Sequence, residues 1–169
     1  SIYSSFLQRA FDNIVHDCAL QHLHVVFALD RSGLVGADGP THHGVLDLGY
    51  LRLIQGMIVM APKDEQELRD MLHSAIYSYT SGPSAIRYPR GNGLGIQLRE
   101  PQNIPLGKGE ILKQGKHIAL VGIGKMVNEC MKAADLLKEQ HIDVTVVNAR
   151  FVKPLDESSS INRRYFDCR

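Results

Sequence analysis

Apolar residues in the first half of the chain form short runs that alternate with helical stripes. Residues 24–29, 57–61 and 84–88 are short runs rich in apolar residues, as is typical of strands that are buried on both faces. Residues 6–21 and 64–79 instead place apolar side chains three and four positions apart, as amphipathic helices do. This alternation of strands and helices predicts an α/β fold with a doubly wound parallel sheet.

The pattern of apolar residues also divides the chain into two domains. Residues 1–92 hold the first α/β domain, and residues 93–106 contain glycines and prolines without sustained periodicity, which predicts a linker. Residues 107–156 begin a second α/β domain, which we expect to be truncated because it contains few elements. Residues 157–169 form an atypical polar tail without a core pattern.

In the second domain, the pattern predicts two strands, a helix and a third strand. Residues 110–114 and 117–123 are expected to pair with each other around Gly115. Apolar residues recur at helical spacing over 126–137, and residues 144–148 suit a strand. A sheet this small is only marginally stable alone. We therefore expect it to pack against the first domain or against a second chain.

Charge and composition argue against several kinds of function. The 19 Lys and Arg residues nearly balance the 18 Asp and Glu residues, and no basic run suggests a nucleic-acid site. No apolar stretch approaches the ~20 residues of a membrane helix, and no signal-peptide pattern is present, so we expect a soluble protein. Cys18, Cys130 and Cys168 lack the spacing of a metal knuckle or a disulfide framework.

The polar segment 30–44, DRSGLVGADGPTHHG, is the strongest candidate for a functional site. It follows the strand predicted at 24–29 and precedes a short helix predicted at 45–54. Ligands of open α/β sheets bind at the carboxyl ends of the strands, and glycines let the backbone approach a ligand closely. Asp38 and His42 can accept, donate or transfer protons there, and the unperturbed pKa of His is about 6.5.

Two arginines, Arg31 and Arg90, each come almost directly after a predicted strand. Because parallel strands end at one edge of a sheet, both guanidinium groups should lie at that edge. Arginine binds phosphate through two parallel hydrogen bonds, so the pair favours a phosphate monoester as substrate. The alternative is that each arginine simply pairs with an acid such as Asp30, Asp38 or Asp47.

Two other patterns are weak evidence for a binding site. The adjacent His42 and His43 could suggest zinc, but neighbouring side chains tend to diverge and no further ligands follow at the usual spacing. The segment GIGKMV at 122–127 lies between a predicted strand and a predicted helix, but it lacks the third glycine and the following acid of a dinucleotide site. A plain turn explains it better.

Several segments, taken in their order, are more specific than any single motif. They are IYSSFLQRAFDNIVHD at 2–17, DRSGLVGADGPTHHG at 30–44, YLR at 50–52, GPSAIRYPRGN at 82–92, IPLGKGE at 104–110 and RFVKPLD at 150–156. This set resembles the 1-deoxy-D-xylulose-5-phosphate synthase family, thiamine diphosphate enzymes of the transketolase type. The resemblance implies a pyrimidine-binding domain followed by part of a transketolase C-terminal domain.

The resemblance also implies a reaction, its cofactors and its residues. Pyruvate would condense with glyceraldehyde 3-phosphate with loss of carbon dioxide, in isoprenoid and thiamine precursor synthesis. The cofactors would be thiamine diphosphate and Mg²⁺, with the metal ligands in a further N-terminal domain, in a homodimer of the bacterial cytoplasm or the plastid stroma. The residues it assigns are, for the pyrimidine pocket, Tyr3, Phe6 and Arg9; for catalysis, Asp38 and His42; and for the acceptor's phosphate, Arg31 and Arg90.

Two other functions stay open on the sequence alone. A β-type subunit of a 2-oxoacid dehydrogenase also combines pyrimidine-binding and C-terminal domains, although the two arginines argue against it. A non-catalytic module could bind a sugar phosphate or a partner at the same edge. In the family, an acid upstream of the IYS segment contacts the pyrimidine ring, and residues 157–169 depart from the family pattern. We therefore expect the isolated chain to bind the cofactor weakly and to be inactive.

Overall fold

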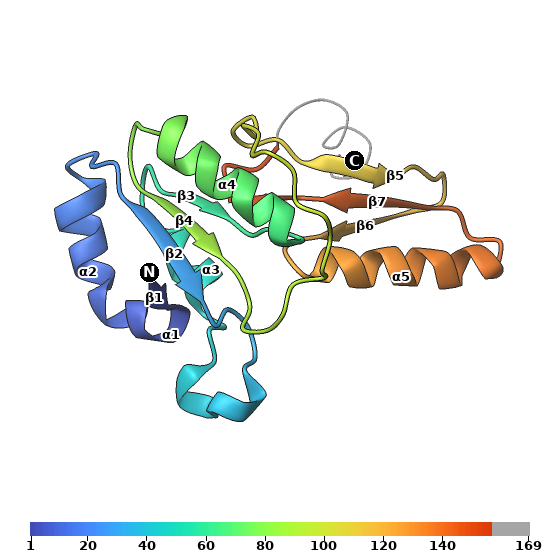
Figure 1. The fold of residues 1–169 in the computed structure, drawn as a ribbon, viewed down its shortest axis with the longest axis horizontal. Helices are drawn as coiled ribbons and strands as arrows, with labels where there is room; N and C mark the ends of the chain where they lie inside the picture. Colours follow the sequence, from blue (N-terminus) through green and yellow to red (C-terminus); the bar gives the residue numbers. More distant parts are fainter. Residues whose placement is uncertain (157–169) are drawn as a thin grey trace.

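The computed structural model describes residues 1–156, which form two sheets lying side by side (Figure 1). The first sheet has the order β1-β2-β4-β3-β8, in which β1, β2, β4 and β3 are parallel and β8 runs antiparallel to β3. Its strands are, in that order, Ile2–Tyr3, Val26–Asp30, Ser84–Arg87, Ile58–Met60 and Phe151–Lys153. The predicted parallel sheet is confirmed, and β8, which the sequence analysis did not anticipate, extends it.

Helices cover both faces of this sheet. On one face, Leu29, Val59 and Ala85 pack against helical residues that include Leu7 and Leu51. The helices of that face are α1 (Ser4–Leu7), η1 (Gln8–Ala10), α2 (Phe11–Asn13), η2 (Ile14–Ala19) and α3 (Asp47–Leu51). On the other face, α4 (Glu65–Tyr77) packs against Met60, Ile86 and Phe151 of the strands. The sheet is therefore doubly wound, as predicted.

The first helical segment is irregular, which corrects one expectation. Residues 6–21 were expected to form one helix with Phe6 and Cys18 on its apolar stripe, but a 3₁₀ turn at η1 and a π-helical stretch at η2 interrupt it. Tighter and wider turns rotate the helix face. As a result Leu7 and Ile14 are buried, whereas the Phe6 side chain is 42% exposed and Cys18 is only partly buried. The exposed Phe6 ring is therefore free to contact a ligand.

The second sheet has the order β5-β7-β6 (Glu110–Lys113, Val144–Asn148 and Ile118–Gly122). The expectation that residues 110–114 and 117–123 pair with each other was wrong, because β7 lies between them, antiparallel to β5 and parallel to β6. All five residues of β7 are buried, so this strand takes the centre of the sheet. The helix α5 (Met126–Glu139) connects β6 to β7 and packs Ala134 against Val144 and Val146.

The predicted linker contains no helix or strand, but it is held along α4. The Glu65 carboxylate accepts hydrogen bonds from the backbone N–H groups of Leu94, Gly95 and Ile96 at 2.6–3.0 Å. Together with the other backbone donors around it, these bonds lower the pKa of Glu65. Arg99 then pairs with Asp70 on the same helix at 2.6 Å. The connection between the two sheets is therefore fixed to the first one.

A buried ion-pair network also joins the two sheets. Glu67 of α4 is 2% exposed, and its carboxylate accepts hydrogen bonds from Arg150 Nε at 2.7 Å, Asn148 Nδ2 at 2.9 Å and Lys63 Nζ at 3.2 Å. Arg150 also donates to Glu110 at 2.8 Å. Burial alone would raise the pKa of Glu67, but Lys63, Arg150 and Asn148 outweigh it and lower that pKa. The carboxylate is therefore held ionised between the sheets.

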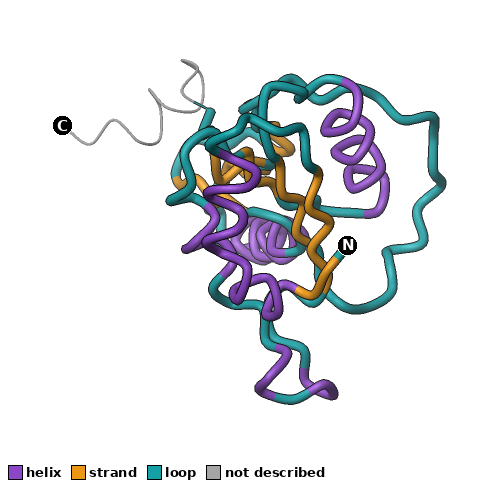
Figure 2. The backbone as a smooth tube through the Cα atoms, turned by 90° about the vertical axis from the view of Figure 1, so that its left-hand side faces the viewer, coloured by secondary structure: helices purple, strands orange, loops and turns teal. Residues whose placement is uncertain are grey.

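Three further points concern helix length, the tail and the candidate segment. Within residues 1–156, none of the helices has the length and apolar composition needed to cross a bilayer. The polar tail predicted at 157–169, with Cys168, lies outside the described residues. The segment 30–44 projects beyond the carboxyl edge of the first sheet, at the bottom of Figures 1 and 2. That edge is where the sequence places its candidate site.

Candidate active site

Both predicted phosphate-binding arginines converge on one carboxylate. Arg31 follows β2, and its Nε donates to Asp38 Oδ2 at 3.1 Å while its Nη1 donates to Asp30 Oδ2 at 2.7 Å. Arg90 follows β4, and its Nε lies 3.4 Å from the same Asp38 oxygen. The two arginines therefore lie at the same edge of the first sheet, as predicted. Both also pair with acids, which is what the alternative interpretation predicted.

The two arginine side chains differ in their exposure and in the number of carboxylates that they contact. The Arg31 side chain is 21% exposed and already has two carboxylate partners, whereas that of Arg90 is 49% exposed with one long contact. Partial burial would lower the pKa of Arg31, but the electrostatic effects of Tyr3 and of the carboxylates of Asp30 and Asp38 outweigh it and raise that pKa. Arg90 therefore offers more unused donors to a ligand than Arg31 does.

An aromatic wall stands next to these charges. The rings of Tyr3 and Phe6 are stacked with centroids 5.2 Å apart, and the His42 ring lies 5.2 Å from Phe6 and 5.8 Å from Tyr3. Arg31 Cζ lies 3.8 Å from the centroid of the Tyr3 ring, a cation–π contact that ties the aromatic and charged groups together. His42 Nδ1 is 2.9 Å from the Thr41 hydroxyl.

Several buried polar atoms at the start of the chain and at the end of β2 have no hydrogen-bond partner within residues 1–156. Asp30 Oδ1 and the hydroxyl oxygens of Ser4 and Ser5 are buried and have no hydrogen-bond partner among the described residues. Buried polar atoms of this kind usually have a partner, which a bound ligand can supply. An exposed aromatic face close to a carboxylate with an unused acceptor oxygen suits a flat heterocycle with an amino group. The chain's own residues thus fit an aminopyrimidine.

Two predicted features do not join this cluster. Arg9 is exposed and makes no hydrogen bond, ion pair or ring contact with any described residue, so its role in the pyrimidine pocket stays a prediction. His43 has different partners from His42, since its Nδ1 accepts a hydrogen bond from Val35 N at 3.1 Å. Among residues 1–156, no group of three or more His, Cys, Asp or Glu side chains could hold a metal ion.

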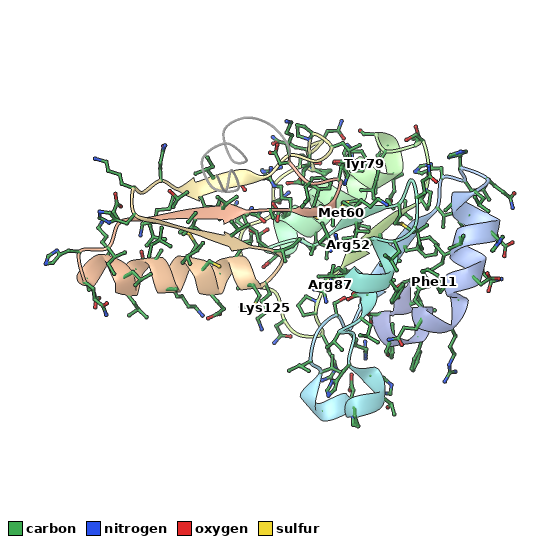
Figure 3. All side chains as sticks on the ribbon, turned by 180° about the vertical axis from the view of Figure 1, so that it is seen from behind. Phe11, Arg52, Met60, Tyr79, Arg87 and Lys125 are labelled. Atoms are coloured by element: carbon green, nitrogen blue, oxygen red, sulfur yellow. The ribbon has the colours of Figure 1, made fainter. Side chains whose placement is uncertain are left out.

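A buried ion pair beneath the loop was missed by the sequence analysis. Asp47, the fully buried first residue of α3, accepts from Arg87 Nε at 2.9 Å and from the Ser32 hydroxyl at 3.1 Å. Arg87 also donates to the carbonyl of Gly44 at 3.3 Å, and Figure 3 shows it near the centre of the molecule. A Cβ on Gly44 would lie 2.4 Å from the Arg31 carbonyl oxygen, so both ends of the loop are tightly anchored.

Removing one bond of this anchor should loosen the loop. We expect Ser32→Ala to lower the free energy of unfolding by about 1.5–3 kcal/mol, the range for a hydrogen bond to a charged group. Urea unfolding of the 169-residue chain measures this, with the exposed Ser81→Ala as the matched control. Equal stability of the two variants would show that the Ser32 hydroxyl does not support the loop.

Comparisons with known proteins identify the families of both α/β units. Residues 1–94 match the family model "Transketolase, pyrimidine binding domain" and residues 107–164 match "Transketolase, C-terminal domain". The 1-deoxy-D-xylulose-5-phosphate synthases of Microcystis aeruginosa and Gloeobacter violaceus are each 58% identical over 158 residues, covering 92% of this chain and 25% of each relative. The chain thus spans about a quarter of the length of these curated relatives.

Solved structures give the same fold. "Split gene transketolase, inactive beta4 tetramer" superposes with a TM-score of 0.79 at 29% identity, covering 92% of this chain and 50% of that one. A transketolase mutant from Pichia stipitis superposes with a TM-score of 0.76 at 24% identity, covering 94% and 23%, and supports the fold alone. The predicted family resemblance is confirmed: the chain belongs to the transketolase family, with a pyrimidine-binding domain and part of a C-terminal domain like those of 1-deoxy-D-xylulose-5-phosphate synthases.

Proposed function

We propose that this chain is part of a 1-deoxy-D-xylulose-5-phosphate synthase, which condenses pyruvate with glyceraldehyde 3-phosphate with loss of carbon dioxide. The observation that supports this most is the single cluster in which Asp38 contacts Arg31 and Arg90 while His42 contacts the exposed ring of Phe6. It combines a flat apolar surface, proton-transfer groups and phosphate-binding groups at one sheet edge. We also propose that the whole protein is a homodimer.

Phe6 would stack on the aminopyrimidine of thiamine diphosphate, with Tyr3 beside it and Arg9 at the rim of the pocket. When bound, this cofactor supplies the carbanion chemistry that removes carbon dioxide from pyruvate and activates the remaining two carbons. Residues outside this chain would hold its diphosphate and Mg²⁺. The task of this chain's residues is to orient the pyrimidine and to keep its ring against an apolar surface.

His42 and Asp38 would handle protons on the acceptor. His42 would donate a proton to the aldehyde oxygen of glyceraldehyde 3-phosphate as that carbon forms its new bond. Asp38, which contacts Arg31 and Arg90, would accept a hydrogen bond from the acceptor's hydroxyl group and assist the transfer of its proton. Arg31 and Arg90 would hold the acceptor's phosphate, which fixes the distance between the aldehyde carbon and the cofactor.

A chimera tests this proposal. The 158 matching residues of this chain would replace their counterparts in the Microcystis aeruginosa relative, and formation of 1-deoxy-D-xylulose 5-phosphate would be measured. We expect product that depends on both pyruvate and glyceraldehyde 3-phosphate, and no turnover by the 169-residue chain alone. A folded, cofactor-binding chimera that consumes pyruvate but transfers the two-carbon unit only to a lipoyl acceptor would instead support the dehydrogenase alternative.

A further inference from the structure

The strand β4 ends at Arg87, an arginine that has no task in the proposed reaction. Its side chain is 17% exposed, and it donates to both oxygens of the Asp47 carboxylate, through Nε at 2.9 Å and through Nη2 at 3.3 Å. Nη2 also donates to the carbonyl oxygen of Gly44 at 3.3 Å. One guanidinium group beside α3 (Figure 3) thus joins β4, the first residue of that helix and the end of the segment 30–44.

Residues 33–44, which we call the site loop, form a closed loop whose two ends pair with each other. Gly33 N donates to the carbonyl oxygen of Gly44 at 2.7 Å, and Gly44 N donates to the carbonyl oxygen of Gly33 at 2.9 Å. Asp38 and His42 lie within this loop, at the ends of its two 3₁₀ turns. A contact that fixes Gly44 therefore fixes the closed end of the loop that carries both residues.

The end of the site loop also packs against the start of the chain. A Cβ atom on Gly44 would lie 2.5 Å from Oγ and 2.6 Å from Cβ of Ser4, so a larger residue would push these two segments apart. Ser4 is fully buried, and it lies directly after Tyr3 and two residues before Phe6, whose stacked rings form the aromatic wall. A displacement of Gly44 would therefore change the distance between the site loop and the aromatic wall.

We propose that Arg87 is a positioning residue, which acts through Asp47 and Gly44 to hold the site loop where Asp38 and His42 reach the acceptor. The inference rests on the proposed function, because that function gives those two residues their tasks. The Asp47 carboxylate is fully buried, so the loss of its partner would leave a buried charge uncompensated. The planar guanidinium group can donate to both carboxylate oxygens and to a carbonyl in one fixed geometry, which a lysine cannot reproduce.

Small movements of the site loop matter because its contacts with the rest of the site are short. Asp38 Oδ2 lies 3.1 Å from Arg31 Nε and 3.4 Å from Arg90 Nε. A misplacement of about 1 Å can lower the rate of an enzyme reaction about 10²-fold. We therefore expect the pair of Arg87 and Asp47 to affect the rate without touching a substrate.

Amide hydrogen exchange of the 169-residue chain, followed residue by residue by NMR, tests the anchoring of the loop without any substrate. We expect Arg87→Lys to raise the exchange rates of the Gly33 and Gly44 amides about tenfold or more, as the loss of charge-assisted hydrogen bonds implies. Asp47→Asn, which keeps the shape of the side chain and removes its charge, should raise the same two rates. Both rates are compared with that of the Ile86 amide in β4, so that a change in global stability cancels.

Arg150→Lys is the matched control. The Arg150 side chain is 18% exposed and pairs with a carboxylate that is 2% exposed, much as Arg87 does, but it lies between the two sheets. In this variant the Gly33 and Gly44 amides should exchange no faster, relative to Ile86, than in the parent chain.

Kinetics of the chimera connect the anchor with the reaction. We expect Arg87→Lys to lower kcat/KM for glyceraldehyde 3-phosphate about tenfold or more, and Arg150→Lys to leave it unchanged. In a chimera that already carries Asp38→Ala, Arg87→Lys should lower kcat/KM by a smaller factor, because one of the groups that it positions is absent. A residue that only stabilised the fold would lower kcat/KM by the same factor in both backgrounds.

Two results would overturn the inference. The first is exchange of the Gly33 and Gly44 amides in both Arg87→Lys and Asp47→Asn at the rates seen in the control. The second is an active chimera in which Arg87→Lys lowers kcat/KM equally with and without Asp38. Either result would leave the proposed function intact. Conversely, loop exchange that depends on Arg87 together with an inactive chimera would keep Arg87 as the residue that positions the loop and would remove the proposed reaction.

Discussion

Replacing Glu67 with alanine should lower the free energy of unfolding by about 3–5 kcal/mol, as the loss of one partner from a buried ion pair does. The substitution leaves Arg150 and Asn148 with fewer acceptors between the two sheets. Urea unfolding at neutral pH measures the change. Glu129→Ala is the control, because its ion pair with Lys132 is exposed and should contribute at most about 1 kcal/mol. A Glu67 variant as stable as this control would show that the network does not hold the sheets together.

The same residue predicts a pH dependence. The pKa of Glu67 is lowered in the folded protein, so its contribution to stability is present above the unfolded-state pKa and is lost as the pH falls through the folded-state pKa. We therefore expect the stability difference between the parent chain and Glu67→Gln to shrink as the pH is lowered below about 4.3, the ordinary pKa of Glu. Unfolding curves at several pH values test this, and a difference that grows in acid would contradict it.

Asp38→Ala in the chimera should lower kcat/KM about 10²- to 10⁴-fold, the usual range for a group that assists proton transfer. The change also removes the carboxylate that Arg31 and Arg90 share, so two like charges would face each other without an acid between them. Steady-state kinetics with varied glyceraldehyde 3-phosphate measures the effect. We expect kcat to fall, because the carboxylate acts on the reacting acceptor.

The control for Asp38 is Asp143→Ala, an exposed acid before β7 in the second unit. It should leave kcat/KM unchanged. If Asp38→Ala raised only the KM for glyceraldehyde 3-phosphate and spared kcat, Asp38 would orient the arginines without taking part in proton transfer. An Asp38→Ala chimera as active as the Asp143→Ala chimera would remove this residue from the site altogether.

Local patterns were enough to predict the first sheet and the location of the candidate site. Short apolar runs became β2, β3 and β4, because a strand buried on both faces needs little else to specify it. The convergence of Arg31, Asp38 and Arg90 followed from strand direction alone, since parallel strands end at the same edge. These features depend on neighbours in sequence or on a general rule of topology.

Features that depend on distant partners were not predictable. Periodicity could not show that β7 would enter between β5 and β6, because pairing is decided by which strand is most completely buried. Nor could it reveal the 3₁₀ and π turns that expose Phe6. The sequence named Asp47 only as a possible partner of Arg31 or Arg90, whereas its partner in the structure is Arg87, which lies 40 residues away.

A crystal structure of the chimera with thiamine diphosphate and glycerol 3-phosphate would test the central claim most directly. The account predicts that the aminopyrimidine lies on the Phe6 ring, with Asp38 and His42 facing the carbon that corresponds to the aldehyde, and that the phosphate contacts Arg90. Density for the pyrimidine away from Phe6, or for the phosphate away from Arg90, would contradict the assignment of this sheet edge as the active site.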